Sequence, residues 1–337
     1  MRHPYLAICT LLTVAGPTTA QERPPIFDVH LHAQRAADQG PPPLALCTPQ
    51  AEWPGWDPVT PYGSVWMDLV KNPPCDDPLW SPETDEEVRD GTLEVMERLN
   101  VFGVLSGEDQ DLQAEWMGAA PGRFVPGAVI GGPAGWLPPD SLRGLIADGH
   151  VQVIGEVVSQ YRGVAPGDPE MTPYWQLAEE FDVPVGIHVG TGPPGVMYLE
   201  EPISGYRARL HSALTLEPVL VEYPSVRVYI MHAGWPMVDD LLALLWAHPQ
   251  VYVDVGIISY WLPDFESYLK RIVDAGFGKR VMFGSDQMLW PEAIARAVQR
   301  IEGMDFLTPE QKRDIFYHNA ARFFRFTQAE IDRHHGR

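Results

Sequence analysis

The sequence has few cysteines and few basic residues, and beyond its N-terminus it has no hydrophobic run long enough to cross a bilayer. Lysine and arginine total 24 against 45 aspartates and glutamates, giving a formal net charge of −21. With no basic run, nucleic acid and anionic membrane surfaces are excluded as expected partners on electrostatic grounds. A membrane-spanning helix needs about 20 apolar residues, and no segment beyond the N-terminus reaches that length.

The first 20 residues are typical of a secretory signal peptide. A charged start with Arg2 precedes the apolar stretch 5–15, and the small residues 17–20 end at Ala20. We expect cleavage near Ala20 and an exported protein, either periplasmic or secreted. A fraying N-terminal helix of a cytosolic protein is the weaker alternative.

Only two of the three cysteines, Cys47 and Cys75, lie outside this leader. Because an exported protein meets oxidising conditions, a Cys47–Cys75 disulfide is expected, with two free thiols as the alternative. Both cysteines fall in the proline-rich segment 33–82, which also contains four tryptophans. Disordered segments are poor in aromatic residues, so we expect a packed insertion without a helix, forming a lid or wall beside a site.

From residue 84 onward the pattern alternates between amphipathic helices and short apolar strands. Including the first strand, we expect eight strands, at 26–32, 101–105, 123–129, 151–157, 183–188, 226–231, 250–255 and 280–284. The helices expected from this pattern are 84–99, 109–118, 138–148, 172–181, 212–222, 236–247, 263–275, 290–302 and a final extra helix at 308–325. Repeated βα units of this number predict one domain, residues 21–337, folded as a (β/α)8 TIM barrel of the α/β class.

Metal-binding side chains stand where several of these strands end. Active sites of such barrels lie at the carboxyl ends of the strands. The groups in question are His30, His32, Glu156, His188, His232 and Asp286. Alone, each histidine could be an ordinary hydrogen-bonded residue, Glu156 a solvated strand end, and Asp286 a helix cap. Their joint occurrence at five strand ends favours one metal site. In a regular β-strand alternate side chains face the same side, so His30, His32 and Asp28 share one face. The other face carries Phe27, Val29 and Leu31.

These residues, in this order, resemble those of the amidohydrolase superfamily, and most closely its amidohydrolase-related branch. The resemblance extends through the segments 28–32, 231–236, 284–286 and 318–324. It implies that His30, His32 and Asp286 hold a buried metal, with Asp286 also near the attacking water. Glu156 occupies the position of a bridging ligand in binuclear members, where His188 and His232 would hold a second ion. In mononuclear members the residue at position 188 joins the first metal and that at 232 acts as a polariser or general acid and base.

The resemblance implies a metal-dependent hydrolase in which a metal-bound hydroxide attacks an amide, ester or lactone of a small molecule. Asp286 and His232 are the expected catalytic residues. The ion expected is zinc, as one or two ions, with manganese or iron as alternatives. A lyase of the same superfamily, either a non-oxidative decarboxylase or a hydratase with one metal, is the alternative reaction. A non-catalytic metal-dependent binding protein is the third hypothesis, and the acidic charge opposes a nuclease.

Residues just beyond the strands are the candidates for substrate binding. They are Tyr161, Arg162, Tyr206, Arg207, Trp235 and Gln287, together with the tryptophans of the insertion. An arginine would suit a substrate carboxylate through bidentate pairing. An ordinary packing or surface role is the alternative for each residue, and a homo-oligomer also stays open.

Overall fold

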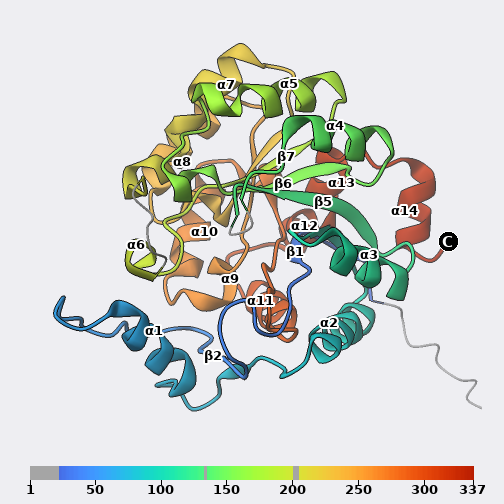
Figure 1. Cartoon of the computed structure of the whole chain (residues 1–337). Helices are drawn as coiled ribbons and strands as arrows, with labels where there is room; N and C mark the ends of the chain where they lie inside the picture. The colour runs from blue at the N-terminus through green and yellow to red at the C-terminus, as the bar shows by residue number, and fades with distance from the viewer. Residues whose placement is uncertain (1–22, 133–134, 200–204) are drawn as a thin grey trace, which may run out of the picture.

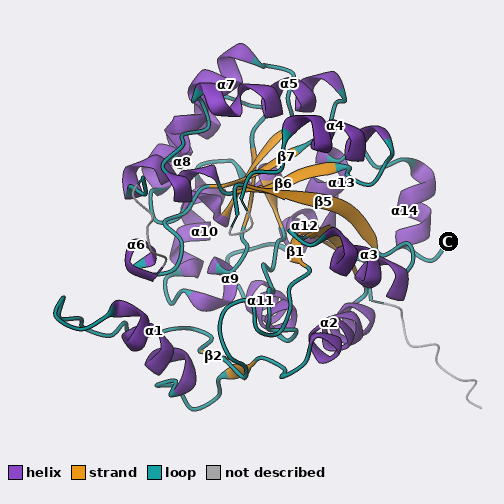
Figure 2. Cartoon of the chain, in the orientation of Figure 1, coloured by secondary structure: helices purple, strands orange, loops and turns teal. Residues whose placement is uncertain are grey.

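Eight parallel strands form the centre of the molecule, with helices around them (Figures 1 and 2). The computed structural model describes residues 23–132, 135–199 and 205–337, so the expected leader lies outside the described residues. The strands are β1 (Ile26–His32), β4 (Val101–Ser106), β5 (Phe124–Ile130), β6 (Val153–Val157), β7 (Val185–His188), β8 (Val228–Met231), β9 (Tyr252–Asp254) and β10 (Val281–Met282). They pair in chain order, which is the topology of successive right-handed βα units.

Hydrogen bonds between the first and last strand segments close the barrel. The Val29 N–H donates to the Phe283 carbonyl over 3.0 Å, and the Asp286 N–H donates to the His30 carbonyl over 2.8 Å. The predicted TIM barrel is therefore confirmed. Closure places the carboxyl end of β1 directly beside the segment that follows β10.

The helices that follow the strands form the outer layer of the barrel. The described ones are α2 (Asp85–Leu99), α3 (Gln110–Ala119), α4 (Pro139–Ala147), α5 (Thr172–Glu180), α6 (Val196–Leu199), α7 (Glu217–Glu222), α8 (Val238–Ala247), α9 (Ile258–Trp261), α10 (Phe265–Asp274) and α11 (Ala293–Glu302). A capping box at Thr84 starts α2, because the Thr84 hydroxyl and the Glu87 carboxylate each accept the other's backbone N–H. None of the described helices combines the length and apolarity that crossing a bilayer requires.

Two predicted helices differ from the structure. The segment 212–222 contains a 3₁₀ turn, Ala213–Leu216, before the short α7. The segment 308–325 divides into α12 (Pro309–Arg313), a π-helical turn (Asp314–His318) and α13 (Asn319–Phe323). A further helix, α14 (Gln328–His334), was not predicted. These C-terminal elements cover the amino-terminal end of the barrel, where the Phe27 ring packs 4.7 Å from the Phe326 ring between centroids.

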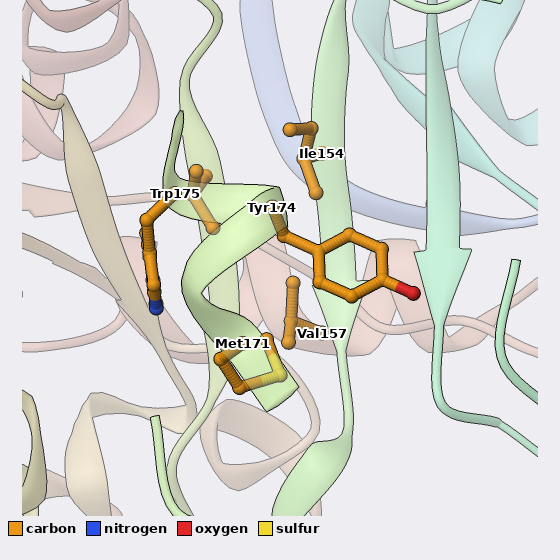
Figure 3. Close-up of a pocket in the computed structure, with 6 residues that line it drawn as sticks. Ile154, Val157, Met171, Tyr174 and Trp175 are labelled. Atoms are coloured by element: carbon orange, nitrogen blue, oxygen red, sulfur yellow. The ribbon is translucent and has the colours of Figure 1, made fainter. Parts of the chain in front are cut away.

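Apolar packing joins the barrel wall to its helices, as the close-up of α5 against β6 illustrates (Figure 3). Tyr174 and Trp175 of α5 line a small apolar pocket together with Ile154 and Val157 of β6. The register of β6 against β7 shifts between Ile154 and Val157, so both residues face the helix layer. Glu156, between them, faces the barrel interior.

The side chains of β1 do not alternate between the two faces of the strand as predicted. Phe27 and Val29 belong to the inner core, whereas Leu31 packs in the outer layer. The register of β1 against β4 shifts between Asp28 and Leu31, which a strictly alternating strand would not allow. His30 and His32 nevertheless both reach the same end of the barrel.

The segment 33–82 forms an excursion at the side of the barrel (Figure 1), buried at 44–47 and largely exposed at 51–61. It contains the antiparallel pair β2 (Ala45–Leu46) and β3 (Leu79–Trp80), and the helix α1 (Tyr62–Lys71). The expectation of no helix here was wrong, because proline is absent from 62–71 although dense on either side. A disulfide joins Cys47 to Cys75. Trp53 packs edge-on against Trp261 of α9, and Trp56 packs against Tyr198 of α6.

Removing the disulfide should destabilise the protein. The bridge spans a sequence separation of 28, and closing a loop of this size contributes about 3 kcal/mol in the chain-entropy description. We expect the Cys47→Ser/Cys75→Ser variant to lose about that much free energy of unfolding in urea titrations. Equal stability of the variant and the oxidised wild type, with no free thiol titratable in the wild type, would contradict this role for the bridge.

Candidate metal centre

Six side chains from five strand ends converge in the barrel mouth. His30 and His32 come from β1, Glu156 from β6 and His188 from the end of β7, while His232 and Asp286 follow β8 and β10. All six are at most 9% exposed. Their ligand atoms form three overlapping triplets, each within 4.8 Å: His30, His32 and Glu156; His30, His232 and Asp286; Glu156, His188 and His232. The structure thus brings together every residue that the sequence predicted as a metal ligand.

The Glu156 carboxylate lies between two pairs of histidines. Its Oε2 is 3.5 Å from His32 Nε2 and 4.0 Å from His30 Nε2. Its Oε1 contacts His188 Nδ1 and lies 3.6 Å from His232 Nε2. Each carboxylate oxygen therefore faces a different pair of imidazoles.

Asp286 stands opposite Glu156 on the other side of the first histidine pair. Its Oδ1 is 3.1 Å from His32 Nε2 and 3.7 Å from His30 Nε2, while its Oδ2 is 4.0 Å from His232 Nδ1. Ligand atoms around a tetrahedral ion with bonds of 2.0–2.2 Å lie about 3.3 Å apart. The spacings between these side chains are therefore compatible with a shared ion.

The donor set also fits a divalent cation chemically. His30 Nε2 is buried and has no hydrogen-bond partner among the described residues, although it faces the cluster. A buried ring nitrogen without a partner is costly, and a metal ion would use its lone pair. Imidazole and carboxylate together suit zinc, manganese or iron.

Mutual charge interactions hold both carboxylates ionised. Burial would raise the pKa of Glu156, but His188 and His232 outweigh it and hold the pKa well below the ordinary 4.5. Burial likewise opposes ionisation of Asp286, yet His30 and His32 lower its pKa. Both groups are thus available as anionic ligands at neutral pH.

The pKa values of three of the histidines are shifted in different directions. Burial lowers the pKa of His30, but Asp286, Asp254 and Glu156 outweigh it and raise the pKa to about 10. Burial and the neighbouring His232 lower the pKa of His188. Burial also lowers the pKa of His232, but the neighbouring Glu156 carboxylate outweighs that effect and the net pKa is raised.

Two of the convergent residues occupy left-handed backbone conformations. His232 has φ 58° and Asp286 has φ 54°, values that non-glycine residues adopt only at a cost of about 1–3 kcal/mol. Hydrogen bonds hold both positions: the His232 N–H donates to Asp254 Oδ1, and the Tyr260 hydroxyl donates to the Asp286 carbonyl. The fold therefore fixes the side-chain directions at the strand ends.

Two residues near the cluster were missed in the sequence. Asp254 ends β9 and contacts His30 Nδ1, so the same strand-end test that found the other six would have found it. His211 is buried 5.9 Å from His188, measured between ring centroids, and packs against Tyr161 and Tyr206. Its position in the long segment after β7 gave no sequence signal.

Several candidate substrate residues contact the protein itself. Arg162 donates to the Gly131 and Gly132 carbonyls, and Arg207 donates to the Tyr206 carbonyl. The Tyr206 hydroxyl donates to the Thr191 carbonyl. Each of these contacts fixes a segment at the barrel mouth.

Three other candidates lie closer to the cluster. The Tyr161 hydroxyl is 2.9 Å from His188 Nε2. Gln287 binds the His32 backbone on both sides, accepting from its N–H and donating to its carbonyl. Trp235 follows the strained turn at His232 and is half-buried. Roles of these residues in substrate binding stay predictions.

Comparisons with known proteins agree with this geometry. Residues 27–326 match the family described as amidohydrolase. The chain therefore belongs to the amidohydrolase family, whose members are enzymes. No curated protein matches the sequence.

Solved structures share the fold at low sequence identity. An uncharacterised TIM-barrel protein from Bordetella bronchiseptica has a TM-score of 0.61 and 16% identity, covering 93% of this chain and 99% of that one. A probable 2-pyrone-4,6-dicarboxylic acid hydrolase from Acinetobacter baumannii has a TM-score of 0.56 and 17% identity, covering 89% and 99%. A dihydroxybenzoic acid decarboxylase from a Polaromonas species, with bound manganese, has a TM-score of 0.56 and 14% identity, covering 91% and 99%.

Metal binding should release protons from the histidine cluster. Because the pKa of His30 is raised to about 10, this residue carries a proton at neutral pH that a divalent ion must displace. We expect calorimetric titration of chelator-treated protein with Zn²⁺ at pH 7.5, in buffers of different ionisation enthalpy, to show at least one proton released per ion. From this group alone, affinity should rise about tenfold per pH unit up to about pH 10.

Protonation of His30 should also affect the stability of the metal-free protein. The folded pKa of His30, about 10, lies above the unfolded value of 6.5, so its stabilisation is complete below pH 6.5 and is lost as pH rises through 10. His30→Gln should release fewer protons on binding Zn²⁺. Binding by the wild type without proton release would show that His30 is neutral or does not bind the ion.

Proposed function

We propose that this protein is a metal-dependent hydrolase that adds water to the carbonyl of an amide, ester or lactone in a small molecule. The single observation that carries the proposal is the position of Glu156 between two histidine pairs. A carboxylate that offers one oxygen to each pair suits two ions on either side of it, an arrangement that serves attack by water.

The ligands divide into two groups under this proposal. His30, His32 and Asp286 would hold the inner ion, and His188 and His232 the outer one, with Glu156 shared between them. A bound divalent ion would lower the pKa of a coordinated water to about 7 and polarise the substrate carbonyl. Zinc is our first choice, given the imidazole and carboxylate donors, and manganese and iron remain alternatives.

Asp286 would act as the general base. Its lowered pKa keeps it unprotonated at neutral pH, so it can accept a proton from the attacking water. Its Oδ1 faces His32 and His30, while its Oδ2 lies 4.0 Å from His232 Nδ1 and would carry the proton to the leaving group. His232 would hold the outer ion in the two-ion arrangement, and with a single ion it would instead polarise the substrate carbonyl.

A lyase is the second candidate, since the manganese-containing decarboxylase shares the fold. In that reaction His30, His32, His188 and Asp286 would hold one ion. The geometry favours the hydrolase, because His188 groups with Glu156 and His232 rather than with the first pair.

We also propose that the protein works outside the cytoplasm on a small molecule. The Cys47–Cys75 disulfide supports export, because such bonds persist in oxidising compartments. The net charge of −21 supports a small-molecule substrate over nucleic acid. The insertion packs on α6 and α9, beyond the carboxyl ends of β7 and β9, which supports its role as a wall of the site.

Removing either a ligand or the base should abolish turnover while the fold persists. We expect His30→Ala and Asp286→Asn to lower kcat/KM at least a thousandfold in a screen of amides, esters and lactones, because His30 would hold the ion that activates water and Asp286 would accept the proton of that water. Circular dichroism should be unchanged. His248→Ala, a histidine at the end of α8 on the opposite rim, is the matched control and should retain full activity.

Labelled water distinguishes the two reactions. Hydrolysis in H₂¹⁸O should place one ¹⁸O atom in the product carboxylate, whereas a decarboxylase would release carbon dioxide from an unhydrolysed substrate. Near-normal turnover in either active-site variant would refute the assigned mechanism. Carbon dioxide release with no ¹⁸O in the organic product would favour the lyase instead.

A further inference from the structure

Asp254 contacts two of the candidate ligands, His30 and His232. Its side chain is completely buried at the end of β9. Its Oδ2 lies 3.1 Å from His30 Nδ1, and its Oδ1 accepts hydrogen bonds from the backbone N–H groups of His232, at 3.0 Å, and Gly256, at 2.8 Å. One carboxylate therefore holds the imidazole of the first ligand and the backbone of another.

These contacts determine which nitrogen of His30 carries the proton in the neutral ring. A carboxylate only accepts hydrogen bonds, so Nδ1 must be the donor toward Asp254. The lone pair of the neutral ring is then on Nε2, the buried nitrogen that faces Glu156 and Asp286 and has no hydrogen-bond partner in the described part of the chain. This is the nitrogen that an ion in the cluster would use.

The second contact supports the strained turn after β8. His232 has φ 58°, and the bond from its N–H to Asp254 is one of the interactions that hold this conformation. Gly256 lies close on the same side, where an added Cβ would come within 2.6 Å of His30 Nδ1. The space around Asp254 and His30 is thus closely filled by backbone.

We propose that Asp254 is a positioning residue that fixes the tautomer of His30, so that Nε2 is free for a metal ion, and anchors the backbone of His232 in the same site. The inference rests on the metal centre of the proposed function. Asp254 does not touch the ion or the substrate in this role. It acts through His30.

The substitution Asp254→Asn should change the contact with the His30 imidazole while keeping the contacts with the backbone N–H groups. The side-chain carbonyl oxygen of the asparagine must remain opposite the His232 and Gly256 N–H groups, because these can only donate. Its amide NH₂ then faces His30 Nδ1, which must accept, and the proton moves to Nε2. We expect Asp254→Asn to weaken Zn²⁺ binding by about 10- to 100-fold, measured by competition with a chromophoric chelator on metal-free protein.

Asp28→Asn provides a matched control. Asp28 is an equally buried carboxylate that accepts from the backbone N–H groups of His30 and Ser285, and among the described residues it has no hydrogen bond to an imidazole nitrogen. Its substitution should reduce Zn²⁺ affinity much less. Equal losses in the two variants would assign Asp254 a general structural role and overturn the inference.

A double-mutant cycle tests whether Asp254 acts through His30. In a His30→Gln background, adding Asp254→Asn should cause little further loss of Zn²⁺ affinity. An undiminished loss in that background would overturn the inference. Wild type that binds Zn²⁺ without turning over any substrate would refute only the proposed reaction, and wild type that binds no Zn²⁺ would refute the metal centre and the inference together.

A measurement on the wild type covers the case in which Asp254→Asn does not fold. In Zn²⁺-loaded protein labelled with ¹⁵N-histidine, His30 should show a protonated Nδ1 and a metal-bound Nε2, with the signal assigned by its loss in His30→Gln. A His30 signal with the proton on Nε2 would overturn the inference.

Discussion

Closure of the barrel between its first and last strands is the constraint on which the site depends. The hydrogen bonds from Val29 to Phe283 and from Asp286 to His30 join segments that lie more than 250 residues apart. Through them the histidines of β1 lie beside Asp286, with His32 Nε2 3.1 Å and His30 Nε2 3.7 Å from its Oδ1. The remaining candidate ligands then follow from strand order, because every parallel strand ends at the same rim.

Charge balance explains why so many ionisable groups can be buried together. Isolated carboxylates in this position would become protonated, but the histidines around Glu156 and Asp286 lower the pKa of each. In the metal-free protein the proton on His30 supplies part of the compensating charge. A divalent cation would replace that proton with a larger positive charge at the same place, so the same cluster that tolerates burial also favours metal binding.

The surroundings of the cluster show how the fold restrains its parts. Gln287 holds the backbone of His32 from both sides, and Asp254 holds the imidazole of His30. Of the two arginines that the sequence suggested as substrate anchors, Arg162 binds a carbonyl of the segment after β5 and Arg207 binds the carbonyl of the preceding residue, Tyr206. At the barrel mouth, α6 and α9 contact the tryptophans of the insertion, Trp56 through Tyr198 and Trp53 through Trp261.

The sequence by itself determined the barrel and its six candidate ligands, because hydrophobic periodicity is local and parallel strands place their ends together. It also determined the start of α2, through the local capping box at Thr84. The π-helical turn and the register shifts of β1 and β6 depend on packing between distant segments, so strict alternation misplaced Leu31. Only the tertiary structure decided that Glu156 lies between two histidine pairs and that Asp254 supports His30, since both depend on side-chain directions set by neighbouring strands.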